Sequence, residues 1–174
     1  QEEESESEDE AYNSEEYLEE PEEKNYEITA ATLPKVSIYR LAKLATDSTI
    51  SGDIYDKVRS MVGMFIYKVI EECKKEGDII TPNMLEAIIQ DTLGVEVQEM
   101  EESEINITKF TKWLKPVVQS YGLTIIQQAL LYFHNAVEFF IYYLFYQASE
   151  LVRKYTRGKR TRIMIDDIEN VIGI

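Results

Sequence analysis

Residues 127–155 read QQALLYFHNAVEFFIYYLFYQASELVRKY, and the fold of the chain depends on this stretch. It contains 29 residues with no Gly or Pro, so as a helix it would extend about 43 Å. Nearly every face is apolar, and a membrane span needs about 20 apolar residues with almost no polar interruption. His134, Asn135 and Glu138 lie near the middle of the apolar part and argue against a span. We therefore expect a long helix that other helices cover on several sides.

The sequence before this stretch predicts a first unit of three helices. A short apolar stripe follows Pro34, a residue that favours the first turn of a helix. Ser51 is the expected N-cap of a long second helix, whose apolar positions follow a 3.6-residue spacing until Gly77. Thr81-Pro82 has the residue types of an N-cap and a first helical position, and it predicts a third helix to about Leu93.

The rest of the chain repeats this order. An acidic connector at 94–107 leads to a short helix expected at 108–120, then to the long helix at 127–155 and to a short helix from residue 165. The architecture thus recurs at roughly 70-residue spacing, although the letters do not. Two such units can cover each other if their long helices cross antiparallel. The loops of each unit then meet the loops of the other.

Charge is unevenly distributed along the chain. The net charge is −15, but residues 1–27 hold 14 acidic residues against the single base Lys24, and residues 28–174 have a net charge of only −2. Within that part, residues 105–174 are net +4. A segment as acidic as 1–27 is expected to be disordered, because it buries too little apolar surface to fold alone. Two roles stay open for it, namely a solvated tail or a binder of basic proteins such as histones.

Composition excludes several classes of site. With one cysteine, Cys73, and one histidine, His134, the chain has neither a disulfide framework nor the ligands of a multi-cysteine metal site. Both residues are expected to be packing residues of the core. The sequence contains no nucleophile–base pair and no phosphate-binding glycine loop, so we predict a non-enzyme without a cofactor or a metal. The acidic N-terminus does not read as a secretory signal, which predicts a soluble intracellular protein.

Two stretches resemble the histone-fold family. Residues 38–70, IYRLAKLATDSTISGDIYDKVRSMVGMFIYKVI, resemble core histone type four without a gap, with RLAK, ISG, IY and the later VR and VI at matching places. ALLYFHNAVEFFIYYLF at 129–145 and KRTRIMIDDI at 159–168 resemble core histone type three. The order is similar to that of the fused histone doublets of large DNA viruses. The resemblance covers residues 34–172, and archaeal doublets have a similar architecture.

The resemblance implies an all-α chain in which two histone folds form an intramolecular handshake pseudodimer behind a disordered acidic N-terminal tail. The tail would occupy 1–27, the type four-like fold 28–93, the acidic connector 94–107 and the type three-like fold 108–174. The family's pairing of a second-loop arginine with an aspartate seven residues later falls on Arg160 and Asp167.

Several positions depart from the family pattern. The minor-groove arginine before ISG is Thr49 here, and the basic second loop of the first unit is replaced by Glu76-Gly-Asp78. In the first unit Gly77 and Met84 stand where the family has its arginine–aspartate pair. The basic tail and the extra helix that precede a type-three fold are also missing. These departures argue against strong nucleosomal DNA binding.

The candidate DNA-binding residues are bases that can meet phosphates. The densest cluster comprises Arg153, Lys154, Arg157, Lys159, Arg160 and Arg162, six bases in ten residues. A solvated helix C-terminus is the alternative explanation for it, since bases there complement the helix dipole. Two further sets lie on the short first helices of the units, namely Lys109, Lys112 and Lys115 and, with a weaker pattern, Lys35, Arg40 and Lys43.

These features predict a histone-like protein that packages double-stranded DNA without sequence specificity, by neutralising phosphates within a nucleosome-like assembly. The expected partners are other histone-fold proteins, with self-association through the second half. The expected location is the nucleus or a virion, in association with chromatin. Two alternatives remain open. One is a histone-fold scaffold of a transcription-type complex, and the other is an acidic-tailed histone mimic or chaperone, both without strong DNA binding.

Overall fold

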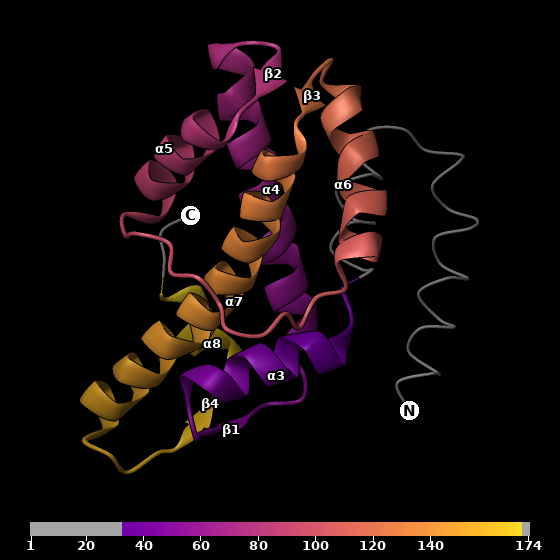
Figure 1. Ribbon diagram of the computed structural model, residues 1–174. Helices are drawn as coiled ribbons and strands as arrows, with labels where there is room; N and C mark the ends of the chain where they lie inside the picture. The colour runs from indigo at the N-terminus through magenta and orange to yellow at the C-terminus, as the bar shows by residue number, and fades with distance from the viewer. Residues whose placement is uncertain (1–32, 172–174) are drawn as a thin grey trace.

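The computed structural model describes residues 33–171, which are mainly helical (Figure 1). Helices make up 68% of this part, so the all-α class is confirmed. The helices are α3 (Lys35–Ala45), α4 (Tyr55–Glu76), α5 (Pro82–Leu93), α6 (Ile107–Ser120), α7 (Gln127–Thr156) and α8 (Ile165–Glu169). The strands are β1 (Thr49–Ile50), β2 (Ile79–Ile80), β3 (Thr124–Ile125) and β4 (Arg162–Ile163). The expected tail at 1–27 lies outside the described residues, as do residues 28–32 and 172–174.

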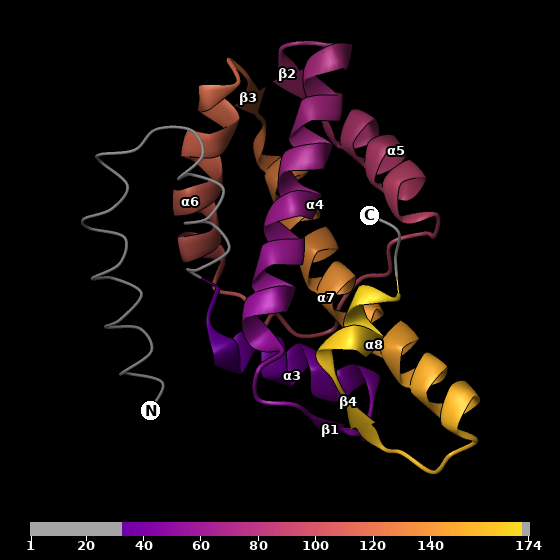
Figure 2. The same cartoon turned by 180° about the vertical axis from the view of Figure 1, so that it is seen from behind.

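The two long helices, α4 and α7, cross each other and are joined at both ends by short parallel ladders (Figures 1 and 2). Strand β1 precedes α4 and pairs with β4, which follows α7, so that Thr49 lies opposite Arg162. Strand β2 follows α4 and pairs with β3, which precedes α7, with Ile79 opposite Thr124. The start of each long helix therefore lies beside the end of the other. The two helices run antiparallel.

One hydrophobic core is shared by both halves of the chain. The rings of Phe65 on α4 and Phe140 on α7 stack near the crossing, with centroids 4.4 Å apart and planes 3° from parallel. Both side chains are fully buried, and the surrounding buried residues come from all six helices of the described part. Such a stack adds about 0.5–1.5 kcal/mol to the energy of burial. The two predicted units are therefore halves of one core.

Most local helix signals are confirmed, and one is wrong. The Thr81 hydroxyl accepts a hydrogen bond from the amide of Met84, and Gly77 follows the end of α4, as expected. Ser51 is not the N-cap of α4, because the carbonyl of Ser51 accepts the Ile54 amide in a turn and the helix begins only at Tyr55. The β1–β4 ladder explains why the helix begins later than predicted, because the Ser51 amide donates to the carbonyl of Ile163 and extends that ladder.

Residues 94–106, which join α5 to α6, contain no helix or strand, but they are anchored to α7. The Glu138 carboxylate, whose residue is only 2% exposed, accepts the backbone amides of Glu104 and Ile105 at 2.6 and 2.7 Å. The His134 Nε2–H donates to the carbonyl of Ile105 at 2.7 Å. Because these bonds compensate the burial of the polar groups, His134 is a satisfied core residue, as predicted.

Asn135 fixes a second point of the same connector. Its side-chain oxygen accepts the amide of Met100 at 2.9 Å, and its side-chain nitrogen donates to the carbonyl of Gln98 at 3.1 Å. The connector crosses α7 at this level before it enters α6 (Figure 1). An N-cap bond from the amide of Lys109 to the Asn106 side chain starts α6 at Ile107, so the connector ends one residue earlier than predicted.

Candidate nucleic-acid interface

The C-terminal part of α7 extends beyond the body of the molecule and carries basic side chains to the end where β1 pairs with β4 (Figures 1 and 2). We call this region, residues 43–50 and 149–163, the basic end. The helix stops because Arg157 and Gly158 have left-handed backbone angles, with φ of 55° and 78°. The Gly158 amide donates to the carbonyl of Arg153 at 3.0 Å and closes the last turn. The loop that follows returns the chain to β4.

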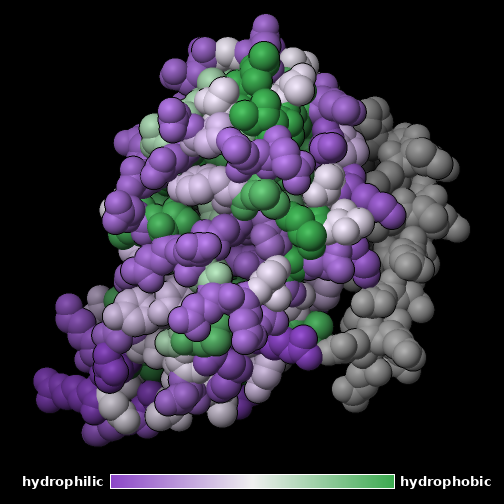
Figure 3. Space-filling model, viewed as in Figure 1, coloured by the Kyte–Doolittle hydropathy of each residue, from purple (hydrophilic) through white to green (hydrophobic). Residues whose placement is uncertain are grey.

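Five of the six clustered bases are exposed, namely Arg153 and four others. Within residues 33–171 no hydrogen bond or ion pair engages the side chains of those four, which are Lys154, Arg157, Lys159 and Arg162. Figure 3 shows the projecting end as strongly hydrophilic. No carboxylate in an ion pair offsets the charge of these four bases, so they are the strongest candidates of the cluster for contact with an anion such as phosphate.

The other two clustered bases already have partners. Arg153 pairs with Glu150 on α7. Arg160 makes two hydrogen bonds to the Asp167 carboxylate, at 3.0 and 3.1 Å, and one to the carbonyl of Arg162 at 2.6 Å. The arginine–aspartate pair that the resemblance implies is thus present. Arg160 contributes to the shape of the loop and has less freedom to contact a phosphate.

Asp167 also accepts the backbone amide of Met164 at 2.7 Å, so one carboxylate fixes both sides of β4. Burial raises the pKa of Asp167, but the hydrogen bonds from Arg160 and the Met164 amide outweigh it and hold that pKa below its ordinary value of 3.8. The same pair raises the pKa of Arg160. The loop that carries the free bases is therefore held by an ionised pair at neutral pH.

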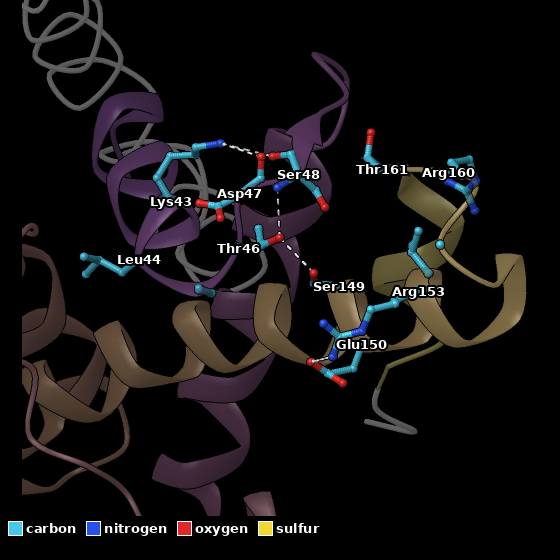
Figure 4. A pocket seen from close by; sticks show the side chains of 13 residues that line it. Lys43, Leu44, Thr46, Asp47, Ser48, Ser149, Glu150, Arg153, Arg160 and Thr161 are labelled. Carbon is cyan, nitrogen blue, oxygen red and sulfur yellow. Dashed lines mark hydrogen bonds and ion pairs between the residues drawn. The ribbon is translucent and has the colours of Figure 1, made fainter.

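A groove of about 460 Å³ lies between the C-terminal end of α3 and the C-terminal part of α7 (Figure 4). The hydroxyls of Thr46 and Ser149 meet across its floor at 2.8 Å. On one wall Lys43 donates to the carbonyl of Ser48 at 3.1 Å, while Leu44 is 56% exposed. The groove therefore has both polar and apolar lining, and its charged residues are of both signs, namely Lys43, Arg153, Arg160, Asp47 and Glu150.

The three basic residues of α3 are partly engaged, and only one of them lies at the basic end. The Lys35 ammonium lies 5.0 Å from the ring centroid of Tyr55. Arg40 lies 4.0 Å from the carboxylate of Glu104 on the connector. Burial raises the pKa of Glu104, and Arg40 acts in the opposite direction. Of the three predicted α3 bases, only Lys43 lies at the basic end, where backbone carbonyls occupy its ammonium.

The α6 lysines are not brought to the basic end. Helix α6 lies beside the other end of α7, next to β3 (Figure 1). Lys112 and Lys115 are exposed there, whereas Lys109 is half-buried. A ligand that covers the basic end would have to bend around the molecule to reach them, so they form a separate candidate surface.

The opposite end of the molecule, where β2 pairs with β3, has different side chains. We call residues 71–80 and 119–126 the apolar end. Ile79 and Ile126 are 53% and 39% exposed, and Figure 3 shows hydrophobic side chains at this end. Sequence reasoning missed this patch, for which the doublets Ile79-Ile80 and Ile125-Ile126 were the available signal.

The bases of the apolar end are neutralised locally. Lys74 lies 3.3 Å from the carboxylate of Asp78, and Lys75 lies 3.1 Å from that of Glu72. Glu71 accepts a hydrogen bond from the Tyr121 hydroxyl at 3.3 Å. Glu76 is exposed beside them, so this end is acidic overall.

Comparison of the chain with protein-family models and with curated proteins finds no match. Across residues 33–171, no three His, Cys, Asp or Glu side chains are grouped so that they could hold a metal ion. In the same range no helix is long and apolar enough to cross a bilayer.

Proposed function

We propose that the chain is a histone-fold pseudodimer, with a type four-like half followed by a type three-like half, that packages double-stranded DNA in a nucleosome-like assembly. The architecture supports this proposal, because a short, a long and a short helix occur twice and the two long helices cross antiparallel. The two parallel ladders join each half's loops to those of the other half, as a handshake pairing requires.

The observation that carries the DNA-binding proposal is the set of four unpaired bases at the basic end. Lys154, Arg157, Lys159 and Arg162 are exposed on one helix end and one loop. Each phosphate that they neutralise releases condensed counterions, so affinity falls steeply as the salt concentration rises. Contacts between such bases and the phosphate backbone carry no sequence information, so we propose no sequence specificity.

The proposed partners are other histone-fold proteins, including further copies of this chain. Leu131, Tyr146 and Met164 of the second half expose apolar surface that a protein partner would cover. A location in the nucleus or a virion, in association with chromatin, follows from the proposed activity.

The test is the affinity for duplex DNA measured against salt concentration, for the full chain and for a chain that lacks residues 1–27. We expect both proteins to bind, with log affinity falling linearly against log salt. We also expect tighter binding without the acidic residues of 1–27. Absence of salt-dependent binding by the shortened chain, with and without added core histones, would contradict the packaging proposal.

A second candidate is a histone-fold scaffold that binds proteins, and the apolar end favours it. There the lysines are paired with acids and two isoleucines are exposed, which suits a protein ligand better than a phosphate. Nuclease digestion separates the two candidates, because a packaging protein protects a defined length of DNA and a scaffold does not. The mimic or chaperone alternative depends on residues 1–27, which lie outside the described residues.

A further inference from the structure

Tyr155 lies on the last turn of α7, where this helix projects beyond the body of the molecule (Figure 2). It is 73% exposed, more than any other large hydrophobic residue of 33–171. Within the same range its ring stacks on no other ring and its hydroxyl makes no hydrogen bond. A single exposed tyrosine is ordinary on a protein surface, so its neighbours decide what it could bind.

The neighbours of Tyr155 are bases. Lys154 precedes it and Arg157 follows two positions later, while Lys159 lies on the loop that leaves the helix. All three are exposed, and no carboxylate of the described chain pairs with them. A ligand at this surface would meet an aromatic face and several positive charges together. A nucleic-acid strand offers the two complementary groups, a planar base and a phosphate, at every nucleotide.

Hydrogen bonds fix the backbone that carries the ring and the bases. The Thr156 hydroxyl donates to the carbonyl of Val152 at 2.7 Å and accepts the amide of Arg160 at 3.1 Å. The Lys159 amide donates to the carbonyl of Thr156 at 3.0 Å. The last turn of α7 and the loop after it are thus held together before a ligand arrives. Preorganisation of this kind lowers the cost of ordering the surface on binding.

The form of the nucleic acid follows from the access that a ring needs. In a duplex the faces of the bases are covered by their stacked neighbours, so a tyrosine reaches a face only where a base is unpaired. Positive charge along the backbone and an aromatic side chain under a base are the usual means of binding a single strand.

We propose that Tyr155 stacks on an unpaired base of single-stranded DNA, whose phosphates contact Lys154, Arg157 and Lys159. The inference rests on the phosphate contacts of the proposed function and adds unpaired strands to the ligands of the basic end. It requires neither a nucleosome-like assembly nor a partner protein.

The test compares two labelled strands of equal length and charge, one of oligo-dT and one of abasic nucleotides, by fluorescence anisotropy with the full chain. Oligo-dT should bind about tenfold more tightly, because only it supplies a base for stacking. Tyr155→Leu should abolish this difference, whereas Tyr155→Phe should keep it because the aromatic face remains. Tyr146→Leu is the matched control, since Tyr146 lies on the same helix and is 41% exposed, and it should leave the difference unchanged.

Equal affinity of the unaltered chain for the two strands would overturn the inference, as would a difference that persists in Tyr155→Leu or disappears in Tyr155→Phe. Tighter binding of oligo-U than of oligo-dT would overturn the assignment to DNA and indicate RNA. Duplex DNA, measured in parallel, separates this inference from the proposed function. If duplex DNA binds and Tyr155→Leu leaves oligo-dT binding unchanged, only the stacking fails. If oligo-dT binding depends on Tyr155 and duplex DNA does not bind, the stacking stands and the packaging proposal fails.

Discussion

The two ends of the molecule share a backbone design and differ in their side chains. At both ends a two-residue parallel ladder joins the start of one long helix to the end of the other. The basic end exposes four bases without acidic partners, whereas the apolar end pairs Lys74 and Lys75 with acids and exposes Ile79 and Ile126. Backbone architecture therefore leaves the choice of ligand open. We propose that the side chains on the loops determine which ligand each end binds, and that DNA binds at the basic end.

The largest expected effect is a loss of stability when the crossing of α4 and α7, which connects the two ends, is disrupted. Phe140→Ala removes the ring that stacks on Phe65 and should lower the free energy of unfolding by about 3–5 kcal/mol, because it leaves a cavity in the shared core. Urea unfolding followed by circular dichroism measures this change. Hydrogen exchange should show that both ladders lose protection together.

Tyr155→Ala is the control for this experiment. Tyr155 is 73% exposed, so its truncation should change stability by no more than about 0.5 kcal/mol. If Phe140→Ala weakened only one ladder, the two ends would be independent units and the comparison between them would lose its basis.

The next effect is the loss of DNA binding at the basic end. Replacing Lys154, Arg157, Lys159 and Arg162 with Gln should lower DNA affinity about 100-fold at low salt and reduce the salt slope by up to about 3.6, since each lost phosphate contact removes about 0.9. Fluorescence anisotropy with a labelled duplex measures both quantities.

Lys74→Gln/Lys75→Gln at the apolar end is the matched control, and it should leave DNA affinity nearly unchanged because both lysines are already paired. Equal losses in the two variants would mean that the ends do not differ in DNA binding.

A smaller gain is expected when basic residues are placed at the apolar end. Glu76→Lys/Asp78→Lys adds two bases and releases Lys74 from its ion pair. The backbone carbonyl of residue 78 still accepts the Thr124 amide, so the ladder should persist. We expect about tenfold tighter DNA binding and a salt slope steeper by about 2. An unchanged slope would show that DNA does not reach this end.

The smallest expected effect is a difference in acid sensitivity between the ends. The folded-state pKa of Asp167 lies below its ordinary value, so its contribution to stability is present above about pH 4 and is lost as the pH falls through the folded pKa. Hydrogen exchange of the Met164 amide, which donates to Asp167, should accelerate in that range.

Asp167→Asn should accelerate the same exchange already at neutral pH and flatten its dependence on acid. The corresponding loop of the apolar end starts α5 with the Thr81 hydroxyl, which does not titrate, and should respond less. Equal acid responses at the two ends would contradict the role assigned to the Arg160–Asp167 pair.

Much of the fold could be predicted because its signals are local. The apolar spacing of α4, its end at Gly77 and the start of α5 at Thr81 each depend on residues a few positions apart. The structure has these helices at the predicted places. The prediction of Ser51 as an N-cap was wrong for the opposite reason. Its amide donates to the carbonyl of Ile163, which is more than 100 positions away in the chain. Of the candidate site, the Arg160–Asp167 pair could be predicted because the family resemblance implies an arginine and an aspartate at these two positions.

The sequence by itself determined the helical class, the repeated order of short and long helices and the position of every charge, because periodicity, capping and composition are written in neighbouring residues. Only the tertiary structure decided that Glu138 and His134 anchor the connector, that the α6 lysines lie away from the basic end, and which bases are free. Those outcomes depend on distances between residues remote in the chain, and they are set when α4 and α7 cross and bring unrelated loops together.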